Sequence, residues 1–516
     1  MHKLAGLATI ALLALSACDA PVRDAAAKHE ATAAEIAWRD GDVAEAFAEA
    51  SEAGRPVLLY WGAVWCPPCN ELKAGLFHNA SFVARTRDFV PVYLDGDSKG
   101  AQRWGEHFAI QGYPTMIVLR PDQTEITRLS GSIDPDEINQ VLRTVQQNKA
   151  TAAQILSQVE TDPQRLSADD WALLAAYGWE IDANKLVASN KRVEVLNRLA
   201  SAAPTDVLKR RFGLVALEAQ AGDDAPAPTA DRQIQIRALL HAILASPDEF
   251  KRNRFTFMYS GADVLKLAGG AAEERHALEL GVIDALDRLY ADERLSIDNR
   301  LLTINTELDI HDLEAAKGAP VPPALLQKVR QRVAWADGAA RTPYERQAVI
   351  SDAASLLEKA GDVAGAESML TAELKRSATP FYYMPDLAHF AEERGDKAKA
   401  LDWLKQGYET STGTASRVQW GILYVQGVIR LSPKDADAVE LSANQIIDEL
   451  GQHPESYHQR TRKRFEGLES DLRKWSAANK GAAVLQRLQT RMHEVCPKTQ
   501  TSTEAREACA AWLARI

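Results

Sequence analysis

The chain has 516 residues, 46% of them hydrophobic and 25% charged, with a net charge of −11 and 5 cysteines. This length accommodates two or three domains with cores of their own, and the composition is that of an ordinary globular protein. The negative charge, with no basic cluster, argues against a nucleic-acid-binding protein. The scarcity of cysteine excludes a fold held together mainly by disulfides.

The first residues have the three-part pattern of an export signal. A basic start is followed by an apolar core over residues 4–15 and by the small residues Ser16-Ala17-Cys18. This core is too short to cross a bilayer as a helix, so we expect residues 1–17 to be a cleaved signal peptide.

Residues 15–18 also resemble a bacterial lipobox, which implies that Cys18 is lipidated and anchors the protein to a membrane. Asp19 resembles the signal that retains lipoproteins at the inner membrane in enteric bacteria. The implied location is the bacterial cell envelope, on the periplasmic side and at the inner membrane. A plain secretory signal with an incidental cysteine is the alternative.

Residues 18–33 are alanine-rich and polar, which predicts a tether. From there to residue 147 the hydrophobic periodicity changes between the helical and the extended pattern. The last helix has the clearest start, because Asp134 is suited to cap it, Pro135 to its first turn and Glu137 to the third position after the cap. The expected order is helix (36–53), strand (57–61), helix (70–77), strand (88–95), helix (101–108), strand (116–119), strand (125–129) and helix (134–147).

The sequence Trp65-Cys66-Pro67-Pro68-Cys69 lies between the first of these strands and the next helix. A CxxC pair in this context is typical of thiol–disulfide redox chemistry. The positive end of a helix dipole lowers the pKa of a cysteine at the helix start, which makes Cys66 the expected nucleophile. Cys69, one turn further on, can resolve a mixed disulfide. Half of a zinc site completed by Cys496 and Cys509 is the alternative, although their spacing fits a zinc knuckle poorly.

Together with Gly112-Tyr113-Pro114-Thr115, the CxxC sequence resembles the thioredoxin fold, and in particular its thiol:disulfide interchange branch. The resemblance covers residues 34–147 and implies an α/β domain with a central mixed sheet flanked by helices. It also implies that a cis peptide bond precedes Pro114 and that Trp65, Tyr113 and Pro114 bind the substrate. The backbone of Tyr113 would then pair with an extended segment. An ordinary trans-proline before a strand is the alternative.

The chain departs from the thioredoxin pattern at one position. Thioredoxins commonly carry a buried aspartate six residues before the first active-site cysteine, where this chain has Tyr60. The usual proton acceptor for the resolving thiol is therefore absent. Glu71, Asp95, Asp97 or water could replace it, but acids are rarely buried, so we expect these three to be solvated surface residues.

From residue 151 the strand signals nearly vanish, and alanine and leucine recur at helical spacing. This pattern predicts an α-solenoid or irregular helical array, with one lobe over residues 151–330 and a second over 331–516. Residues 357–370 and 391–404 are similar at an offset of 34 residues, which is the tetratricopeptide period. Stacked helix pairs offer concave surfaces to a partner, and a helical scaffold without a binding groove is the alternative.

Cys496 and Cys509 flank a short stretch near the end of the chain. In an oxidising compartment we expect them to form a structural disulfide, with a second redox centre as the alternative. His453, His458 and His493 are spaced loosely like metal ligands, but without further ligands they predict no metal site.

These expectations combine into one hypothesis. An envelope-anchored thiol:disulfide oxidoreductase, favoured as a reductase, acts on protein disulfides through Cys66 and Cys69 and needs no cofactor besides this redox-active disulfide. By resemblance to the family, its electron donor is a membrane thiol reductase. An oxidase or isomerase would share the site and differ only in redox potential. The alternative from another class is a helical-repeat binding or assembly lipoprotein that uses its thioredoxin-like domain for docking.

Overall fold

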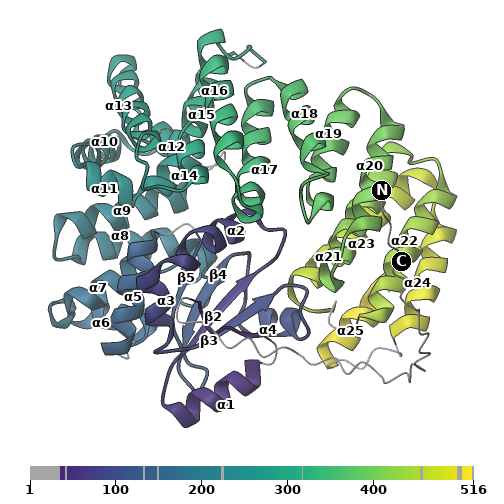
Figure 1. The fold of residues 1–516 in the computed structure, drawn as a ribbon, viewed down its shortest axis with the longest axis horizontal. Coiled ribbons are helices and arrows are strands. Elements are labelled where there is room, and N and C mark those ends of the chain that lie inside the picture. Colours follow the sequence, from purple (N-terminus) through teal and green to yellow (C-terminus); the bar gives the residue numbers. More distant parts are fainter. Residues whose placement is uncertain are drawn as a thin grey trace, which may run out of the picture.

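The computed structural model describes residues 35–40, 43–131, 134–147, 150–221, 226–316, 318–453, 457–496 and 503–513. The expected signal peptide (1–17), Cys18 and the tether (18–33) lie outside the described residues. Two parts are visible in Figure 1: an α/β domain (residues 35–147) and a helical array (residues 150–513) that curves around it. Among the described residues, no helix has the length and apolar character needed to cross a bilayer.

A mixed sheet with the strand order β1-β3-β2-β4-β5 forms the centre of the α/β domain. β2 pairs in parallel with β3 and antiparallel with β4, and β5 pairs antiparallel with β4. Every residue of β2 is buried, because helices cover both faces of the sheet. The strands are β1 (Arg39–Asp40), β2 (Val57–Gly62), β3 (Val90–Asp95), β4 (Thr115–Leu119) and β5 (Glu125–Ser130).

Alternate side chains of β2 point to opposite faces of the sheet. Leu59 and Trp61 pack in one cluster with residues of α1 and α4, whereas Leu58 and Tyr60 pack in another with residues of α2, α3 and α5. These two helical layers hold β2 in the middle of the domain. The helices of the domain are α1 (Val43–Ala53), α2 (Pro67–Ala74), α3 (Ala80–Thr86), α4 (Ala101–His107) and α5 (Pro135–Gln147), with a 3₁₀ turn at Leu76–His78.

Two elements differ from the sequence expectation. The helix expected over residues 36–53 begins at Val43, and Arg39–Asp40 instead forms a short strand beside β3. Gly41 lies between the two elements, and glycine disfavours a continuous helix. α3 was not expected; Asn79 caps it by accepting hydrogen bonds from the N–H groups of Ser81 and Phe82.

The rest of the described chain is helical, and the predicted order of an α/β domain followed by an all-helical region is confirmed. Successive helices pack against each other along the chain (Figure 1). The helices are α6 (Ala152–Thr161), α7 (Ala168–Ala175), α8 (Arg192–Ala202), α9 (Asp206–Gln220), α10 (Ala230–Leu244), α11 (Pro247–Arg252), α12 (Arg254–Ala268), α13 (Ala272–Tyr290), α14 (Ile297–Leu302), α15 (Asn305–Glu314), α16 (Pro323–Ala339), α17 (Pro343–Lys359), α18 (Val363–Glu373), α19 (Met384–Glu393), α20 (Lys397–Thr410), α21 (Thr414–Leu431), α22 (Ala436–Gln452), α23 (Gln459–Asn479), α24 (Ala482–Val495) and α25 (Thr503–Ala511). Short 3₁₀ turns lie at Pro163–Arg165, Trp179–Ile181, Ser189–Lys191 and Pro380–Tyr382.

The two similar stretches of sequence build the same corner between helices. α17 and α19 are each followed by a glycine with positive φ, Gly361 (83°) and Gly395 (78°). The next residues, Asp362 and Asp396, cap α18 and α20 by accepting a hydrogen bond from a backbone N–H three residues on. A glycine for the left-handed turn followed by an acidic cap explains why the two stretches resemble each other.

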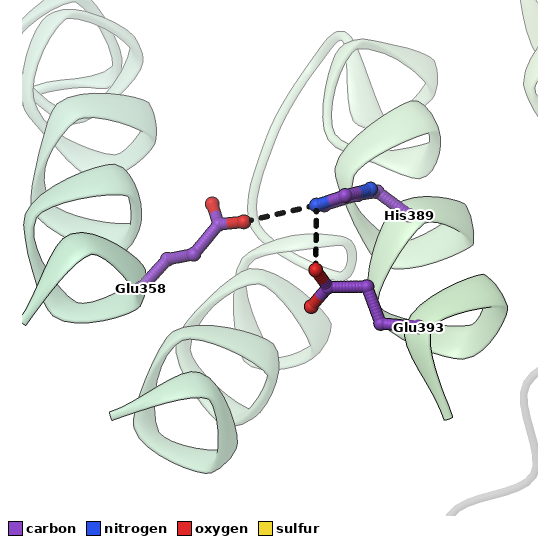
Figure 2. A group of neighbouring side chains, drawn as sticks. All are labelled: Glu358, His389 and Glu393. Carbon is purple, nitrogen blue, oxygen red and sulfur yellow. Dashed lines mark ion pairs between the residues drawn. The ribbon is translucent and has the colours of Figure 1, made fainter. Parts of the chain in front are cut away.

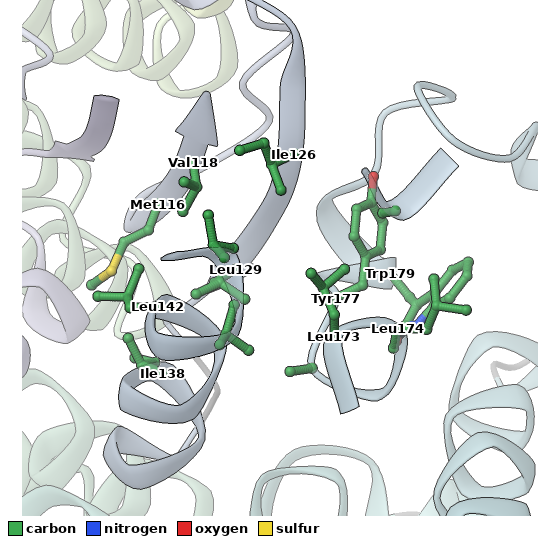
Figure 3. Packing of buried hydrophobic residues seen from close by; sticks show 14 of the residues in the cluster. Met116, Val118, Ile126, Leu129, Ile138, Leu142, Leu173, Leu174, Tyr177 and Trp179 are labelled. Atoms are coloured by element: carbon green, nitrogen blue, oxygen red, sulfur yellow. Dashed lines mark hydrogen bonds between the residues drawn. The ribbon is translucent and has the colours of Figure 1, made fainter. Parts of the chain in front are cut away.

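The α/β domain and the first helices of the array share a hydrophobic core. One cluster of buried residues includes Leu129 and Leu142 of the domain and continues to Leu174 and Trp179 after it (Figure 3). The N–H of Gly178 also donates to the carbonyl O of Arg128 in β5 at 2.9 Å. Further along, a single cluster runs from residue 301 to residue 390. The division into two lobes near residue 330 stays a prediction.

Candidate functional site

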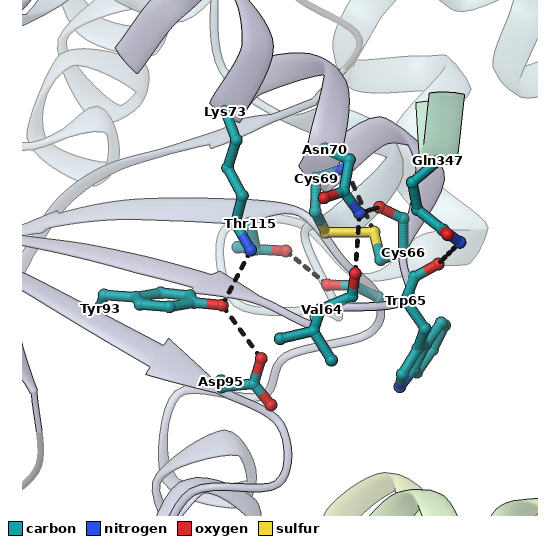
Figure 4. Close-up of a disulfide and its surroundings, with 11 residues drawn as sticks. Val64, Trp65, Cys66, Cys69, Asn70, Lys73, Tyr93, Asp95, Thr115 and Gln347 are labelled. Atoms are coloured by element: carbon teal, nitrogen blue, oxygen red, sulfur yellow. Dashed lines mark hydrogen bonds between the residues drawn. A yellow bond between two sulfur atoms is a disulfide. The ribbon is translucent and has the colours of Figure 1, made fainter. Parts of the chain in front are cut away.

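Cys66 and Cys69 form a disulfide at the start of α2, with their Cα atoms 5.2 Å apart (Figure 4). Cys66 is the N-cap of the helix, and its Sγ accepts a hydrogen bond from the N–H of Cys69 at 3.3 Å. Pro67 and Pro68 fill the first helical positions, where an N–H has no partner within the helix. A thiolate at Cys66 would lie at the positive end of the helix dipole, which supports Cys66 as the nucleophile.

The loop before the disulfide is held by a residue that sequence reasoning missed. Asn70 Nδ2 donates to the carbonyl O of Val64 at 2.9 Å and to that of Cys66 at 2.8 Å. Because Asn70 is buried, these bonds fix the position of Trp65 relative to α2 (Figure 4). The only sequence feature that indicated a role for Asn70 is its position directly after the CxxC sequence.

The peptide bond between Tyr113 and Pro114 is cis, as the resemblance implied. Thr115 Oγ1 donates to the carbonyl O of Gly112 at 2.8 Å and closes this turn. Within the described part of the chain, no hydrogen bond engages the backbone N–H or C=O of Tyr113. These two groups are therefore available to pair with an added extended segment.

The helical array covers the disulfide on the Trp65 side. Trp65 is only 8% exposed, and Cys66 only 3%. The indole Nε1 of Trp65 donates to Ser416 Oγ at 2.8 Å, and Gln347 Nε2 donates to the carbonyl O of Trp65 at 2.8 Å. Aromatic side chains of the array complete the cover, with the rings of Tyr382 and Trp420 centred 5.8 and 5.3 Å from that of Trp65. Sequence reasoning could not find Gln347 and Ser416, because no motif marks them.

Asp97 connects the α/β domain to the same part of the array. Its carboxylate accepts hydrogen bonds from the N–H of Ser416 at 2.7 Å and from Ser416 Oγ at 2.6 Å. Ser416 Oγ in turn accepts a hydrogen bond from Trp65 Nε1. A continuous row of hydrogen bonds thus joins the loop after β3, the helix α21 and the CxxC loop. The expectation that Asp97 is a solvated surface acid is wrong, because the array packs over it. Burial raises its pKa, an effect partly offset by the hydrogen bonds from Ser416.

Replacing Asp97 with alanine is expected to loosen this cover. A hydrogen bond to a carboxylate contributes about 1.5–3 kcal/mol, so the loss of even one of the two bonds should make reduction of the disulfide by a bulky phosphine at least roughly 10- to 100-fold faster. The measurement is the reduction rate of Asp97→Ala, in a background with Cys496 and Cys509 changed to serine. Asp136→Ala, at an exposed acid of the same domain, is the control. Equal rates for the two variants would show that Asp97 does not hold the cover.

Glu71 lies on the other side of α2, near the buried carboxyl group of Asp298 and the half-buried one of Asp352 in the array. Its carboxylate accepts hydrogen bonds from Ser296 Oγ at 2.6 Å and from Asn299 Nδ2, so it is not a solvated surface acid either. Burial raises the pKa of Glu71. Burial and the charge of Asp352 raise the pKa of Asp298 well above its usual range.

The contact between α2, α14 and α17 is expected to weaken as the pH rises. Burial raises the pKa of Asp352 from 3.8 to about 6. The folded state thus keeps a proton that the unfolded state releases, so this contribution to stability is complete below pH 3.8 and is lost as the pH rises through about 6. Thermal unfolding between pH 4 and pH 7 measures it. Asp352→Asn, next to Glu71 and Asp298, should flatten this part of the pH profile; an unchanged profile would contradict the assignment.

Tyr60, at the position where an acid was expected, is fully buried and stacks on Tyr93 with ring centroids 5.3 Å apart. Burial raises the pKa of its hydroxyl, which keeps the group neutral.

A row of hydrogen-bonded polar side chains connects α2, the helix of Cys69, to β3 (Figure 4). Lys73 Nζ donates to the hydroxyl of Tyr93 at 3.2 Å, and this hydroxyl donates to Asp95 at 3.0 Å. Asp95 is therefore half-buried and hydrogen-bonded rather than freely solvated.

The other cysteines lie at the far end of the array. Cys496, directly after α24, and Cys509 in α25 form a disulfide with Cα atoms 5.8 Å apart. Both residues are buried in a cluster with side chains of α22, α23 and α24. This disulfide lies away from α2 and covalently links the last two helices, α24 and α25. Cys18 lies outside the described residues.

Glu358, His389 and Glu393 are the group of potential metal ligands found in the described part of the chain (Figure 2). His389 Nε2 lies 3.1 Å from Glu358 and 3.6 Å from Glu393. The side chains of His389 and Glu393 are more than half exposed, and exposed acidic groups gather in this way without a metal ion. His458, considered at the sequence level, instead bonds through Nδ1 to Glu106 at 2.6 Å.

Comparison with known proteins agrees with this geometry. Residues 43–146 match the thioredoxin-like domain family. Among solved structures, a thioredoxin from Thermus thermophilus is 26% identical and covers 21% of this chain and 88% of its own, with a TM-score of 0.20. No curated protein matches. The predicted fold class is confirmed, and residues 43–146 form a thioredoxin-like domain that carries the Cys66–Cys69 pair and is followed by a long all-helical region.

Proposed function

We propose that this protein is a thiol–disulfide oxidoreductase that reacts through Cys66 and Cys69. The observation that carries the proposal is the Cys66–Cys69 pair at the start of α2 in a domain of the thioredoxin-like family. The Cys66 sulfur at the N-cap has the position in which a thiolate is stabilised, and Cys69 is within bonding distance of it.

The reaction follows the rules of thiol–disulfide exchange. The Cys66 thiolate attacks one sulfur of a substrate disulfide, forms a mixed disulfide and releases the first substrate thiolate. The Cys69 thiolate then attacks the Cys66 sulfur and releases the second substrate thiolate. Two electrons pass to the substrate, each released thiolate takes up a proton, and the Cys66–Cys69 disulfide remains. Regeneration needs a dithiol donor that is oxidised in the same two steps.

In its finer form, the proposal is a reductase of protein disulfides, supplied by a membrane thiol reductase and anchored through Cys18 to the periplasmic side of the inner membrane. The export pattern and lipobox of residues 1–18 support the location, and resemblance to the interchange branch supports the donor. The repeated corner after α17 and α19 supports a tetratricopeptide-like array that selects clients.

One observation favours the alternative of a binding or assembly lipoprotein. Cys66 is 3% exposed and Cys69 is fully buried, so the array docks on the surface through which a thioredoxin-like domain would react. Under this alternative the domain holds the array in place and the disulfide is structural.

The equilibrium of the Cys66–Cys69 pair against a glutathione series separates the two proposals. The protein used is the chain from residue 19 onward, with Cys496 and Cys509 changed to serine. A potential near −270 mV, like that of thioredoxin, supports a reductase, and one near −120 mV indicates an oxidase or isomerase. A disulfide that glutathione does not reduce at any ratio would refute the oxidoreductase and support the structural role.

A further inference from the structure

A cavity of about 520 Å³ lies between the redox centre and the helical array. The α/β domain contributes the start of α2 with Pro67 and Pro68, the cis turn with Tyr113 and Pro114, and Gly131 after the edge strand β5. On the Trp65 side the array closes over the disulfide through Ser416, Gln347 and Trp420. The cavity is therefore an open space that adjoins the cis turn on the side away from Ser416 and Trp420, and a second, much smaller pocket lies beside Trp65 and Tyr113.

The opposite wall belongs entirely to the array. It is formed by the chain after α7, by α9, α11, α12 and α17, and by the 3₁₀ turn at Pro380–Tyr382. Aromatic side chains supply much of this wall: Tyr177, Trp179, Phe255, Tyr259 and Tyr382. The aromatic rings can contact apolar parts of a ligand, and the tyrosine hydroxyl groups can form hydrogen bonds with its polar parts.

The size of the cavity restricts what can bind beside the CxxC helix and the cis turn; Cys66 and Cys69 themselves are buried behind Pro67 and Pro68 and do not line it. Its volume lies in the range of about 300–1,000 Å³ that is typical of small-ligand pockets. A stable interface with a folded protein requires about 800 Å² of surface on each partner, which the enclosed turn does not offer. The occupant must be a small molecule or a short stretch of chain.

The backbone groups that line the cavity favour a short polypeptide segment over a small molecule as the occupant. The N–H and C=O of Tyr113 make no hydrogen bond within the described residues and lie in the turn that lines the cavity. Ser130 and Gly131, at the end of the edge strand, line the same space. An extended segment can pair with such groups, whereas a low-molecular-weight disulfide leaves them unsatisfied.

The charges on the walls favour basic side chains. Four carboxyl groups, of Glu71, Glu180, Glu218 and Asp352, face two guanidinium groups, of Arg211 and Arg252. Glu71 and Glu218 are held by neutral donors, the latter by Thr256 Oγ1 at 2.8 Å. Within the described residues no cation is hydrogen-bonded to either group, although burial raises the pKa of both and the charges of Arg254 and Arg211 act against that shift. In their ionised form these carboxylates attract a cationic ligand.

We propose that this cavity is the substrate site, and that its array walls admit an extended segment of a polypeptide carrying the reacting disulfide, with a preference for lysine or arginine beside the cystine. The proposal rests on the proposed function and deepens it, because it gives the helical array the role of selecting unfolded or locally extended chains over folded surfaces. Val215 and Glu218 of α9 act in selection and do not take part in the exchange itself.

The test uses reduced protein and probes whose single cysteine carries a thionitrobenzoate group, so that attack by Cys66 releases a chromophore. The probes are a short peptide flanked by lysines, the same peptide flanked by glutamates, and a folded protein labelled at a surface cysteine. Val215→Phe narrows the cavity, and Val207→Phe, at an exposed position of the same helix, is the matched control. Glu218→Gln removes one wall charge. The glutathione equilibrium of each variant is measured alongside, since it does not depend on the route of entry.

We expect the lysine peptide to react about tenfold faster than the glutamate peptide and the folded probe to be slowest. Val215→Phe should lower the second-order rate constant for the lysine peptide at least about tenfold with an unchanged glutathione equilibrium. Val207→Phe should match the parent, and Glu218→Gln should reduce the difference in rate between the two peptides. Equal rates for Val215→Phe and Val207→Phe, or a folded probe as fast as the peptides, would overturn the cavity proposal. A pair that never exchanges with glutathione would instead refute the proposed function.

Discussion

Replacing Cys66 with serine is expected to abolish disulfide exchange. A serine hydroxyl is not ionised at neutral pH, whereas the thiolate is the attacking group, so the rate should fall by at least about a thousandfold. Cys69→Ser should behave differently, because Cys66 can still attack but its mixed disulfide is no longer resolved. Release of thionitrobenzoate from a lysine-flanked peptide measures the first effect, and a stable protein–peptide adduct in mass spectrometry measures the second.

The matched control for these variants is the double change Cys496→Ser and Cys509→Ser, which removes the remote disulfide and leaves α2 intact. It should keep the exchange rate of the parent. If Cys66→Ser retained turnover, or if the double variant lost it, the reacting pair would have been assigned wrongly. In the first case the binding or assembly role of the helical array would become the better account.

The largest loss of stability is expected from Arg128→Ala. Arg128 in β5 is fully buried, and its guanidinium donates to Glu125 at 2.7 and 2.8 Å and to the carbonyl oxygens of Phe108 and Ile181 at 3.0 Å each. Ile181 belongs to the array, so one side chain holds the edge of the sheet against it. Removing one partner of a buried ion pair costs about 3–5 kcal/mol, because the other charge and the carbonyl groups stay unpaired.

Urea unfolding, followed by tryptophan fluorescence, measures this loss. Arg198→Ala removes an exposed ion pair with Glu160 and is the control, with an expected cost below about 1 kcal/mol. Changing Glu125 to leucine together with Arg128→Leu should recover part of the loss, since no buried charge is then left alone. Equal midpoints for Arg128→Ala and Arg198→Ala would mean that Arg128 does not join the two parts.

The elements of the α/β domain could be predicted where local chemistry decides them. Asp134, Pro135 and Glu137 predicted the start of α5 correctly, because capping and dipole effects act within one turn. The Cys66–Cys69 pair was found in the same way, from its place between a strand and a helix. Local signals failed near Gly41 and at Asn79, where a break and a cap were each overlooked.

The surroundings of the site could not be predicted, because they are made by contacts distant in sequence. Glu71 and Asp97 look like surface acids when only their neighbours in sequence are considered. They are covered by Ser296 and Asn299 in one case and by Ser416 in the other, residues that carry no motif. Burial is a property of the assembled array, and with it come the raised pKa values and the restricted access to the disulfide.

The hydrogen bond from Trp65 to Ser416 spans 351 residues, which has a consequence for the newly made chain. A ribosome adding roughly 5–20 residues per second needs about 20–70 s to travel from one position to the other. The thioredoxin-like domain is therefore synthesised long before α21, and a chain interrupted before residue 416 lacks the Ser416 side of the cover over Trp65.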